Sequence, residues 1–470
     1  MTYSVSTFRL FVVIAIVVLV AYAPAAEEPS PAGMPVLPFQ EIFSHDFSLP
    51  ANLILAKDQV TAVKGRGSNA FDVTQSAPKT GFLYPAKLET LASGKTMMVG
   101  GGLSGSTGPD LSGYADFTQL FLCRLTHEGY TLKPYNILGE YIDKDGVTGP
   151  LFLNAWTVDS GVKYRNGADN VGSRHCVEDK NIHLIIYTRI NGVLFIYVDG
   201  VLAAEGTAKL PLRGNGIAYS VDMPNGSMSS IGTHALLAAS FFGVGVDAGG
   251  VARLDEYYRA AYPADYKPAS LLKTELWIYN SNSIGQGYFY GNANVPSAKL
   301  MAALSTKYQK NVTRWYNLSL GGIDTQRMSK EAPIYVDPFW KMCNGRKNLL
   351  LHEGTNDIAL NKVTGEQAYD NLKTYWQARQ AAGCDRVFVA TILPRDGFSP
   401  AQEEARIECN NLIRANAVKD GVSGIVDFDT NPHLMNAKDK NYYSDGVHPN
   451  PAGVQEMADT IATAIAPFVD

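Results

Sequence analysis

Residues that together can cleave an ester occur at separate positions in the C-terminal half of the chain. Ser283 follows the apolar run 276–279, and a serine at the point where a strand breaks into a turn exposes its hydroxyl group. Asp445 stands three residues before His448, a spacing at which a carboxylate can hold an imidazole in one tautomer. Since a serine becomes nucleophilic when a histidine takes its proton, this combination predicts acyl transfer through a serine.

Two glycine-containing segments lie between these positions and contain groups that can stabilise an oxyanion. Segments 317–322 (NLSLGG) and 354–357 (GTND) each follow an apolar or aromatic run that indicates a strand. The first offers the backbone N–H of Gly322, and the second offers the side-chain amide of Asn356. Together with the N–H of Ser283, these groups form a candidate oxyanion hole.

The four segments, in this order and at these spacings, resemble the blocks of the SGNH/GDSL hydrolases over residues 270–470. The resemblance implies a carboxylic ester hydrolase with a three-layer α/β fold that needs no metal ion or cofactor. It also implies a role for each matching residue. Ser283 would be the nucleophile, His448 the base, Asp445 the acid that orients it, and Gly322 and Asn356 the oxyanion donors.

The serine block departs from the Gly-Asp-Ser of that family, because it reads Ser281-Asn282-Ser283. A Ser-Asn pair is also similar to the sialate O-acetylesterase branch, and that register would make Ser281 the nucleophile. We favour Ser283 because the segment 354–357 follows the plainer GDSL pattern. The altered block also leaves an alternative from another class, a non-catalytic glycan-binding or adhesion protein with a degenerate SGNH domain.

The other candidate acids and bases of this half of the chain fit structural roles better. His352 ends a predicted strand, His433 lies in a loop, and only His448 has a carboxylate at an orienting spacing. Asp357 follows Asn356 directly, and we expect it to hold its own loop through local N–H bonds.

Strand and helix patterns alternate beyond residue 270, which predicts a parallel sheet covered by helices on both faces. The expected strands are 275–279, 313–317, 348–352, 386–392 and 424–428, and the expected helices are 295–309, 364–382, one that begins at Ser399-Pro400 and one that begins at Asn450-Pro451. Because parallel strands end at one edge of a sheet, the candidate site residues would converge there.

The preceding region, residues 35–265, has the pattern of an all-β sandwich or jelly roll. In 183–205, the pairs Asn191-Gly192 and Asp199-Gly200 predict tight turns between three successive strands. Further strands are expected at 236–246 and at Arg253-Leu254. No helical pattern separates these strands, which favours a purely β fold.

Parts of this region are similar to concanavalin A-like or laminin G-like domains, namely 193–201, 241–246 and 254–257. Such domains often bind glycans, so the resemblance implies an accessory carbohydrate-binding module, with a purely structural sandwich as the alternative. Tyrosines such as Tyr114 and Tyr164 could stack on sugar rings, but tyrosine is also an ordinary strand residue, and none is assigned to binding.

The N-terminal segment and a proline-containing segment mark the limits of the predicted domains. Residues 1–26 combine Arg9, an apolar run at 10–20 and a small-residue end, which predicts a secretory signal peptide and a secreted or periplasmic protein. The run is short for a membrane span of about 20 residues. Segment 263–270 contains two prolines and is the predicted linker between domains 35–265 and 270–470.

The net charge of the chain limits the kinds of partner that it is expected to bind. A net charge of −5 without a Lys/Arg-rich run argues against nucleic-acid and membrane-surface partners, and leaves an acylated carbohydrate or a small ester as the expected substrate.

In an exported chain Cys123 could pair with Cys176, and Cys384 with Cys409, or all five cysteines could be buried thiols. Their spacing does not match a zinc site.

Overall fold

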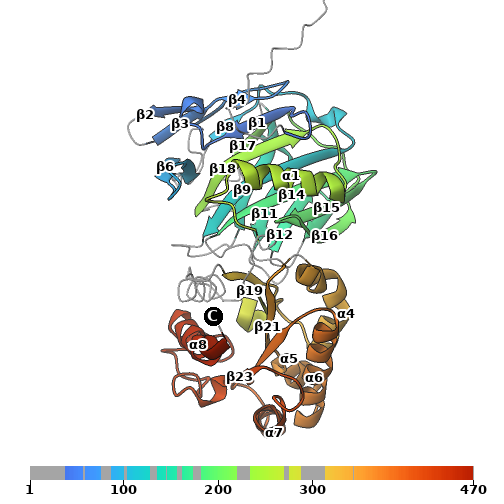
Figure 1. Ribbon diagram of the computed structural model, residues 1–470, viewed down its shortest axis with the longest axis vertical. Helices are drawn as coiled ribbons and strands as arrows, with labels where there is room; N and C mark the ends of the chain where they lie inside the picture. The colour runs from blue at the N-terminus through green and yellow to red at the C-terminus, as the bar shows by residue number, and fades with distance from the viewer. Residues whose placement is uncertain are drawn as a thin grey trace, which may run out of the picture.

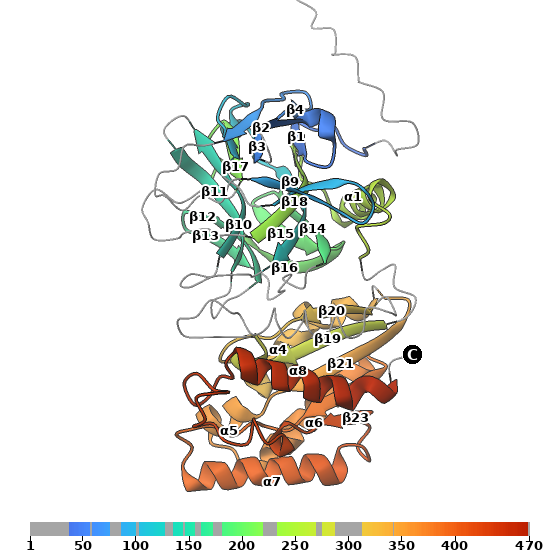
Figure 2. The same cartoon turned by 90° about the vertical axis from the view of Figure 1, so that its left-hand side faces the viewer.

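The computed structural model describes residues 37–468 except for 57–58, 76–85, 100–102, 127–134, 144–145, 156–160, 173–180, 220–232, 269–274, 287–312 and 342. The chain forms an all-β N-terminal part stacked on an α/β C-terminal part (Figures 1 and 2). The predicted signal peptide, residues 1–26, lies outside the described residues. Within the described ranges, no helix combines the length and the apolar character that a bilayer crossing requires.

The N-terminal part is an antiparallel β-sheet that is curled into two layers, as the all-β prediction requires. One layer contains β1 (Phe43–Asp46), β18 (Thr233–Phe242), β9 (Phe117–Thr126), β14 (Ile182–Ile190), β15 (Val193–Val198) and β16 (Val201–Thr207). The other contains β12 (Gly161–Asn166), β11 (Gly146–Ala155), β10 (Tyr135–Asp143), β17 (Gly216–Tyr219), β8 (Leu103–Gly105), β5 (Val73–Gln75) and β3 (Gln59–Val63). Shorter strands flank these layers, namely β2 (Leu53–Ala56), β4 (Gly65–Arg66), β6 (Lys87–Thr90), β7 (Thr96–Val99) and β13 (Asp169–Gly172).

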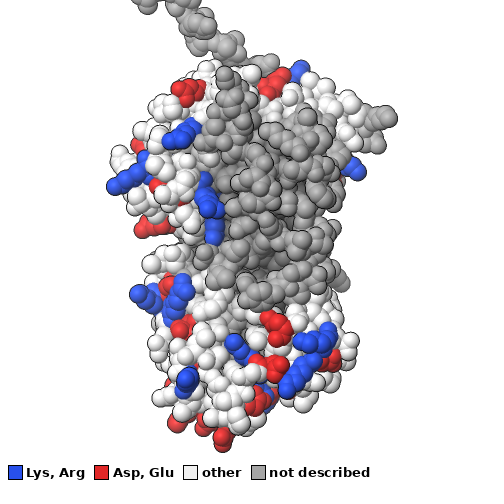
Figure 3. All heavy atoms as spheres, turned by 180° about the vertical axis from the view of Figure 1, so that it is seen from behind, with Lys and Arg blue, Asp and Glu red and all other residues white. Residues whose placement is uncertain are grey.

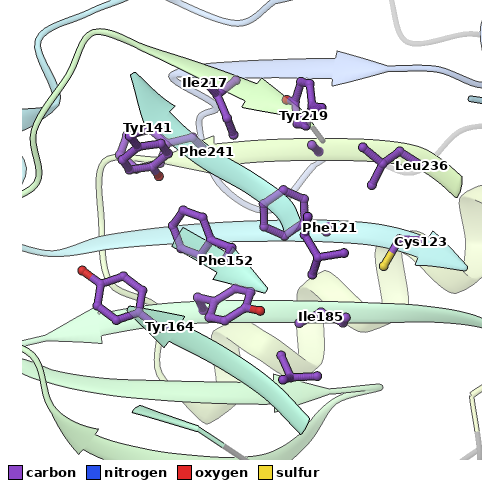
Figure 4. Packing of buried hydrophobic residues seen from close by; sticks show 14 of the residues in the cluster. Phe121, Cys123, Tyr141, Phe152, Tyr164, Ile185, Ile217, Tyr219, Leu236 and Phe241 are labelled. Atoms are coloured by element: carbon purple, nitrogen blue, oxygen red, sulfur yellow. The ribbon is translucent and has the colours of Figure 1, made fainter. Parts of the chain in front are cut away.

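Aromatic side chains from both layers form the core of the sandwich (Figure 4). The ring centroids of Phe152 and Tyr187 lie 4.9 Å apart, and those of Tyr141 and Phe241 lie 5.9 Å apart. Edge-on ring pairs of this kind add about 0.5–1.5 kcal/mol to the stabilisation that burial provides. Tyr164 is fully buried in the same core. It is therefore not available to stack on a sugar.

Helix α1 (Ala248–Ala261) covers the outer face of the first layer (Figures 1 and 2). Its buried residues Val251, Leu254 and Tyr258 pack with Leu120 and Leu122 of β9. The prediction of a strand at Arg253-Leu254 is wrong. Helix α1 follows β18, the last strand of the sandwich, and among the described residues no α-helix lies between β1 and β18, as the sequence pattern predicts. The apolar residues recur every three or four positions, which is the helical period, and Asp247 caps the helix by accepting the Gly250 N–H at 2.8 Å.

Both predicted tight turns are confirmed. Asn191 and Gly192 join β14 to β15 with φ angles of 51° and 76°, and Asp199 and Gly200 join β15 to β16 with φ angles of 52° and 81°. Left-handed φ at both turn positions matches the right-handed twist of the strands, which explains the Asn-Gly and Asp-Gly sequences.

The C-terminal part is built on the predicted parallel sheet. Its strands lie in the order β20 (Thr313–Asn317), β19 (Glu275–Ser281), β21 (Arg346–His352), β22 (Arg386–Ala390) and β23 (Gly424–Val426). The last two strands end two residues before their predicted ends. After β23 the chain turns into a short 3-10 helix, η6 (Phe428–Thr430).

Helices cover both faces of this sheet, as predicted (Figure 2). One face carries α4 (Thr325–Tyr335), α6 (Gly365–Ala381) and α7 (Pro400–Asn416), and the other carries α8 (Pro451–Ile465). Successive side chains of β19 point to opposite faces of the sheet: Leu276 packs toward α6 and Trp277 packs toward α8. Capping boxes at Thr364 and Ser399 start α6 and α7. The predicted helix 295–309 lies outside the described residues.

The cysteines that the structure describes are buried thiols. Cys123, Cys343, Cys384 and Cys409 are all free, so the bond between Cys384 and Cys409 that the sequence leaves open is not formed. Cys176 lies outside the described residues. On the surface shown in Figure 3, basic and acidic side chains of the described residues lie among one another.

The β15–β16 end of the sandwich contacts the β20 side of the C-terminal sheet. The Tyr316 hydroxyl on β20 donates a hydrogen bond to Asp199 Oδ2 at 2.8 Å. Asp199 also accepts the Leu184 N–H at 3.0 Å and lies 2.9 Å from His183 Nδ1, and both ionisable side chains are fully buried. Asp199 is therefore a turn residue and also a link between the two parts of the chain.

We predict that Tyr316→Phe lowers the free energy of unfolding by about 1–3 kcal/mol, because it removes a donor from a buried carboxylate. Urea unfolding measured by fluorescence checks this value. Tyr257→Phe is the matched control, since the Tyr257 hydroxyl forms no hydrogen bond to any described residue. Equal losses in the two variants would show that the link to Asp199 contributes nothing to stability.

Candidate active site

Ser283 lies where the central strand β19 gives way to a short helix, α2 (Ser283–Gln286). The Asn282 side chain fixes this turn, because its Oδ1 accepts the Ile284 N–H at 2.8 Å. Ser283 is half-buried. As the first residue of α2, its N–H has no acceptor within the helix.

The C-terminal loop brings an imidazole and a carboxylate to this serine. His448 Nε2 lies 2.9 Å from Ser283 Oγ, and His448 Nδ1 lies 2.8 Å from Asp445 Oδ2. Asp445 Oδ1 accepts the backbone N–H groups of Val447 and His448 at 2.9 and 2.8 Å. The three side chains, far apart in sequence, thus form one continuous chain of hydrogen bonds.

The charge of Asp445 orients the histidine. Burial acts to raise the pKa of Asp445, but the backbone N–H and the ring of His448, together with the Val447 N–H, outweigh it and hold the pKa below its usual value. The carboxylate is therefore ionised at neutral pH and favours the tautomer with the proton on Nδ1. Nε2 is then left as the acceptor that faces the Ser283 hydroxyl.

The two predicted oxyanion donors lie next to each other. Asn356 Nδ2 donates to the carbonyl of Ile323 at 2.7 Å, and Ile323 directly follows Gly322. An amide nitrogen carries two hydrogens, so one remains available for a ligand. Gly322 has a left-handed φ of 71°, and a Cβ at this position would meet open space. Within the described part of the chain, no acceptor is bound to the Gly322 N–H.

Parallel pairing aligns the strand ends that carry these groups. Ser281 of β19 is in register with His352 of β21, and the Leu320 N–H after β20 donates to the Ser281 carbonyl at 3.0 Å. The Asn317 side chain donates to the Gly285 carbonyl at 2.8 Å, which joins the glycine segment to the serine turn. The carboxyl ends of three strands are thereby fixed at one edge of the sheet.

Ser281, the alternative nucleophile, does not reach the histidine. Its side chain is fully buried, and its Oγ donates to the His352 carbonyl at 2.5 Å. Gly285 lies directly over it, since a Cβ on Gly285 would come within 2.7 Å of Ser281 Oγ. Ser283 lies beyond the end of β19, in α2, and the geometry assigns the hydroxyl that faces His448 to Ser283.

His352 and Asp357, the other candidate acids and bases discussed from the sequence, make contacts that support the fold. His352 is buried, which lowers its pKa to about 3, and its Nδ1 lies 3.0 Å from the Tyr279 hydroxyl. Asp357 accepts the Thr325 N–H at 3.1 Å, the Thr325 hydroxyl and the Asn371 amide. The expectation that Asp357 bonds only within its own loop is therefore wrong, because it joins α5 (Thr355–Asn361) to α4 and α6.

Glu353 is a site residue that the sequence interpretation missed. It is 1% exposed, and its Oε1 accepts the Asn356 N–H at 3.3 Å. Burial raises the pKa of Glu353 well above its usual range and the charge of Asp357 adds to this, while the Asn282 amide and two backbone N–H groups act in the opposite direction. These surroundings favour the protonated form of Glu353. The sequence does contain a signal that could have identified Glu353. It stands between the end of a predicted strand, at His352, and the first residue of the Gly-Thr-Asn-Asp segment, Gly354.

We predict that the stability of the protein carries a pH dependence that originates at Glu353. The stabilising contribution is fully present below the unfolded-state pKa of about 4.5 and is lost as the pH rises toward the higher folded-state pKa. In that window the folded state holds one more proton, so the free energy of unfolding falls by up to about 1.4 kcal/mol per pH unit. Glu353→Gln keeps the shape of the protonated acid and removes this slope.

Urea unfolding of wild type and Glu353→Gln between pH 5 and 7 measures the difference. Glu366→Gln, at an exposed position in the first turn of α6, serves as the control and keeps the wild-type slope. Parallel curves for wild type and Glu353→Gln would show that Glu353 is ionised in the folded protein.

Comparison with known proteins bears on the C-terminal half. Among solved structures, the chain is similar to a member of the lipolytic protein G-D-S-L family from Veillonella parvula DSM 2008, with 19% identity and a TM-score of 0.34, over 40% of this chain and 97% of that one. It is also similar to an acetylxylan esterase from Geobacillus stearothermophilus, with 13% identity and a TM-score of 0.33, over 41% of this chain and 94% of that one. No curated protein matches the sequence.

A family model covers the region that contains the site. Residues 282–456 match the model of the GDSL-like lipase/acylhydrolase family. This match spans the serine turn, the glycine segment, the Gly-Thr-Asn-Asp segment and the Asp445–His448 loop, and it confirms the resemblance seen in the sequence. The C-terminal part of the chain therefore carries a GDSL-like lipase/acylhydrolase domain.

Proposed function

We propose that the C-terminal domain is a carboxylic ester hydrolase that uses Ser283 as its nucleophile. The observation that carries this proposal is the hydrogen-bonded chain from Ser283 Oγ to His448 at 2.9 Å and on to Asp445 at 2.8 Å. A hydroxyl, an imidazole and a carboxylate in that order form the arrangement that activates serine in acyl transfer.

The reaction follows from what each group can do. Ser283 Oγ attacks the acyl carbon while His448 Nε2 takes its proton, and Asp445 stabilises the imidazolium. When the tetrahedral intermediate collapses, the imidazolium gives this proton to the departing alcohol, and the acyl group stays on Ser283. Water then attacks the acyl-serine with His448 as the base, which releases the acid and regenerates the serine.

The oxyanion of both tetrahedral intermediates would be held by three donors. These are the N–H of Ser283, the N–H of Gly322 and the second amide hydrogen of Asn356. The bond from Asn356 Nδ2 to the Ile323 carbonyl supports this role, because it sets the direction of the amide before a substrate arrives.

The proposed substrate is an acyl ester on a carbohydrate, with the acetyl ester as the first choice. Two features of the sequence support this choice, the predicted export of the chain and the likeness of the sandwich to glycan-binding domains. The proposal includes a secreted or periplasmic location and an accessory role for the sandwich. Faster cleavage of a long-chain p-nitrophenyl ester than of acetylated oligosaccharides would contradict the carbohydrate assignment.

We predict that Ser283→Ala lowers the turnover of p-nitrophenyl acetate at least about 1,000-fold, because it removes the hydroxyl that lies 2.9 Å from His448 Nε2. Ser281→Ala is the matched control two residues away, and it keeps the rate within about 10-fold. Equal rates for wild type and Ser283→Ala would favour the alternative of a binding protein with an inactive domain.

We also predict that Asn356→Ala lowers kcat by about 100- to 1,000-fold, with little change in KM, because the lost hydrogen bond forms only as the oxyanion develops. Steady-state kinetics with p-nitrophenyl acetate measures this split. Asn361→Ala is the control on the same helix, since Asn361 is exposed and its amide bonds to Asp324 at 3.0 Å, away from the site. A change in KM alone would remove Asn356 from the oxyanion hole.

A further inference from the structure

Arg395 lies on a loop that touches both sides of the proposed site. This loop, residues 391–399, connects β22 to α7. At its start, Ile392 packs against Gly354 so closely that a Cβ on that glycine would lie 2.5 Å from Ile392 Cδ1. Further along, the Asp396 N–H donates to the Gly446 carbonyl at 2.8 Å. Arg395 is thus held between the segment that carries Asn356 and the loop that carries His448.

The guanidinium of Arg395 is half-buried and has no anionic partner among the described residues. The guanidinium lies over the ring of Phe398, whose centroid is 5.8 Å away. Two neighbouring arginines on α7 are bound differently. Arg406 pairs with Glu403 and Asp429, and Arg414 pairs with Asp427 and Asp429. Arg395 therefore keeps its charge and all five donors available at the edge of the site.

The acids near Arg395 do not neutralise it. Burial lowers the pKa of Arg395, while the charges of Asp445 and Glu353 act in the opposite direction, so both carboxyl groups lie within electrostatic range. The surroundings of Glu353 favour its protonated form, and the Asp445 oxygens are bound by His448 and Val447. A half-buried guanidinium whose donors meet no acceptor of the described protein is placed to bind the oxygens of an anionic ligand.

We propose that Arg395 binds a carboxylate of the substrate close to the scissile ester, which makes an acylated, uronic-acid-containing glycan the substrate class of this domain. The inference rests on the proposed function. The flat fork of a guanidinium matches the two oxygens of a carboxylate, and the resulting pair is strong and directional. Because the Arg395 guanidinium forms no hydrogen bond or ion pair with a described catalytic side chain, a role in positioning those groups does not explain its place.

The test compares an acidic substrate with its uncharged methyl ester and uses a small uncharged ester as the reference. The probes are an O-acetylated oligogalacturonate, the methyl ester of the same oligomer, and p-nitrophenyl acetate. We expect wild type to prefer the free acid to its methyl ester by at least about 10-fold in kcat/KM. Arg395→Gln removes this preference and leaves p-nitrophenyl acetate within about 3-fold, and Arg395→Lys has an intermediate effect.

Lys438→Gln is the matched control, because it removes a nearby positive charge that is 75% exposed and lies 3.7 Å from Asp396. It leaves all three kcat/KM values unchanged. The proposal is overturned if wild type treats the acid and its methyl ester alike. It is also overturned if Arg395→Gln lowers all three values by one common factor, which would place Arg395 in the shared chemistry.

Equilibrium binding separates this inference from the proposed function. Isothermal titration with unacetylated oligogalacturonate needs no turnover, and we expect Arg395→Gln to weaken the Kd at least about 10-fold. If wild type hydrolyses none of the esters but the Kd still depends on Arg395, the hydrolase proposal fails and the carboxylate site stands. Equal Kd values for the two proteins would overturn the carboxylate site whatever the rates show.

Discussion

Parallel pairing of β20, β19 and β21 is the constraint on which the site depends. It fixes the carboxyl ends of three strands at one edge, and the loops that leave them have only a few residues in which to place the reacting groups. Hydrogen bonds between these loops complete the arrangement, from Leu320 to Ser281, from Asn317 to Gly285, and from Asn356 to Ile323. Each bond satisfies a buried polar group and also sets a distance within the site.

The surroundings of two carboxyl groups near the site shift their pKa values in opposite directions. Asp445 receives two backbone N–H groups and an imidazole, which stabilise its negative charge. Glu353 is enclosed more completely and lies near another acid, and these conditions favour its neutral form. The proposed base therefore has a fixed anionic partner, and the loop that holds Asn356 is supported without a second charge that would compete for the imidazolium.

Local chemistry explains which elements could be predicted from the sequence. Turns that need positive φ and helices with capping boxes have short-range causes, so Asn191-Gly192 and Ser399 identify their structures. The helical period around Leu254 was equally local but was mistaken for a strand. The choice between Ser281 and Ser283 depends on which way each side chain points after β19 ends, and that direction is fixed by tertiary contacts.

The contact between the two parts of the chain shows a further limit of sequence reasoning and a role for buried charge. Asp199 was predicted from its turn geometry alone, yet its carboxylate receives a hydroxyl from the C-terminal sheet. Burying such a group adds little net stability, because desolvation offsets much of the gain. A displaced arrangement would leave the carboxylate without the Tyr316 donor, which is strongly unfavourable. The polar contact therefore favours one particular docking of the sandwich, and apolar residues such as Val201, which packs into the core of the C-terminal part, supply the attraction.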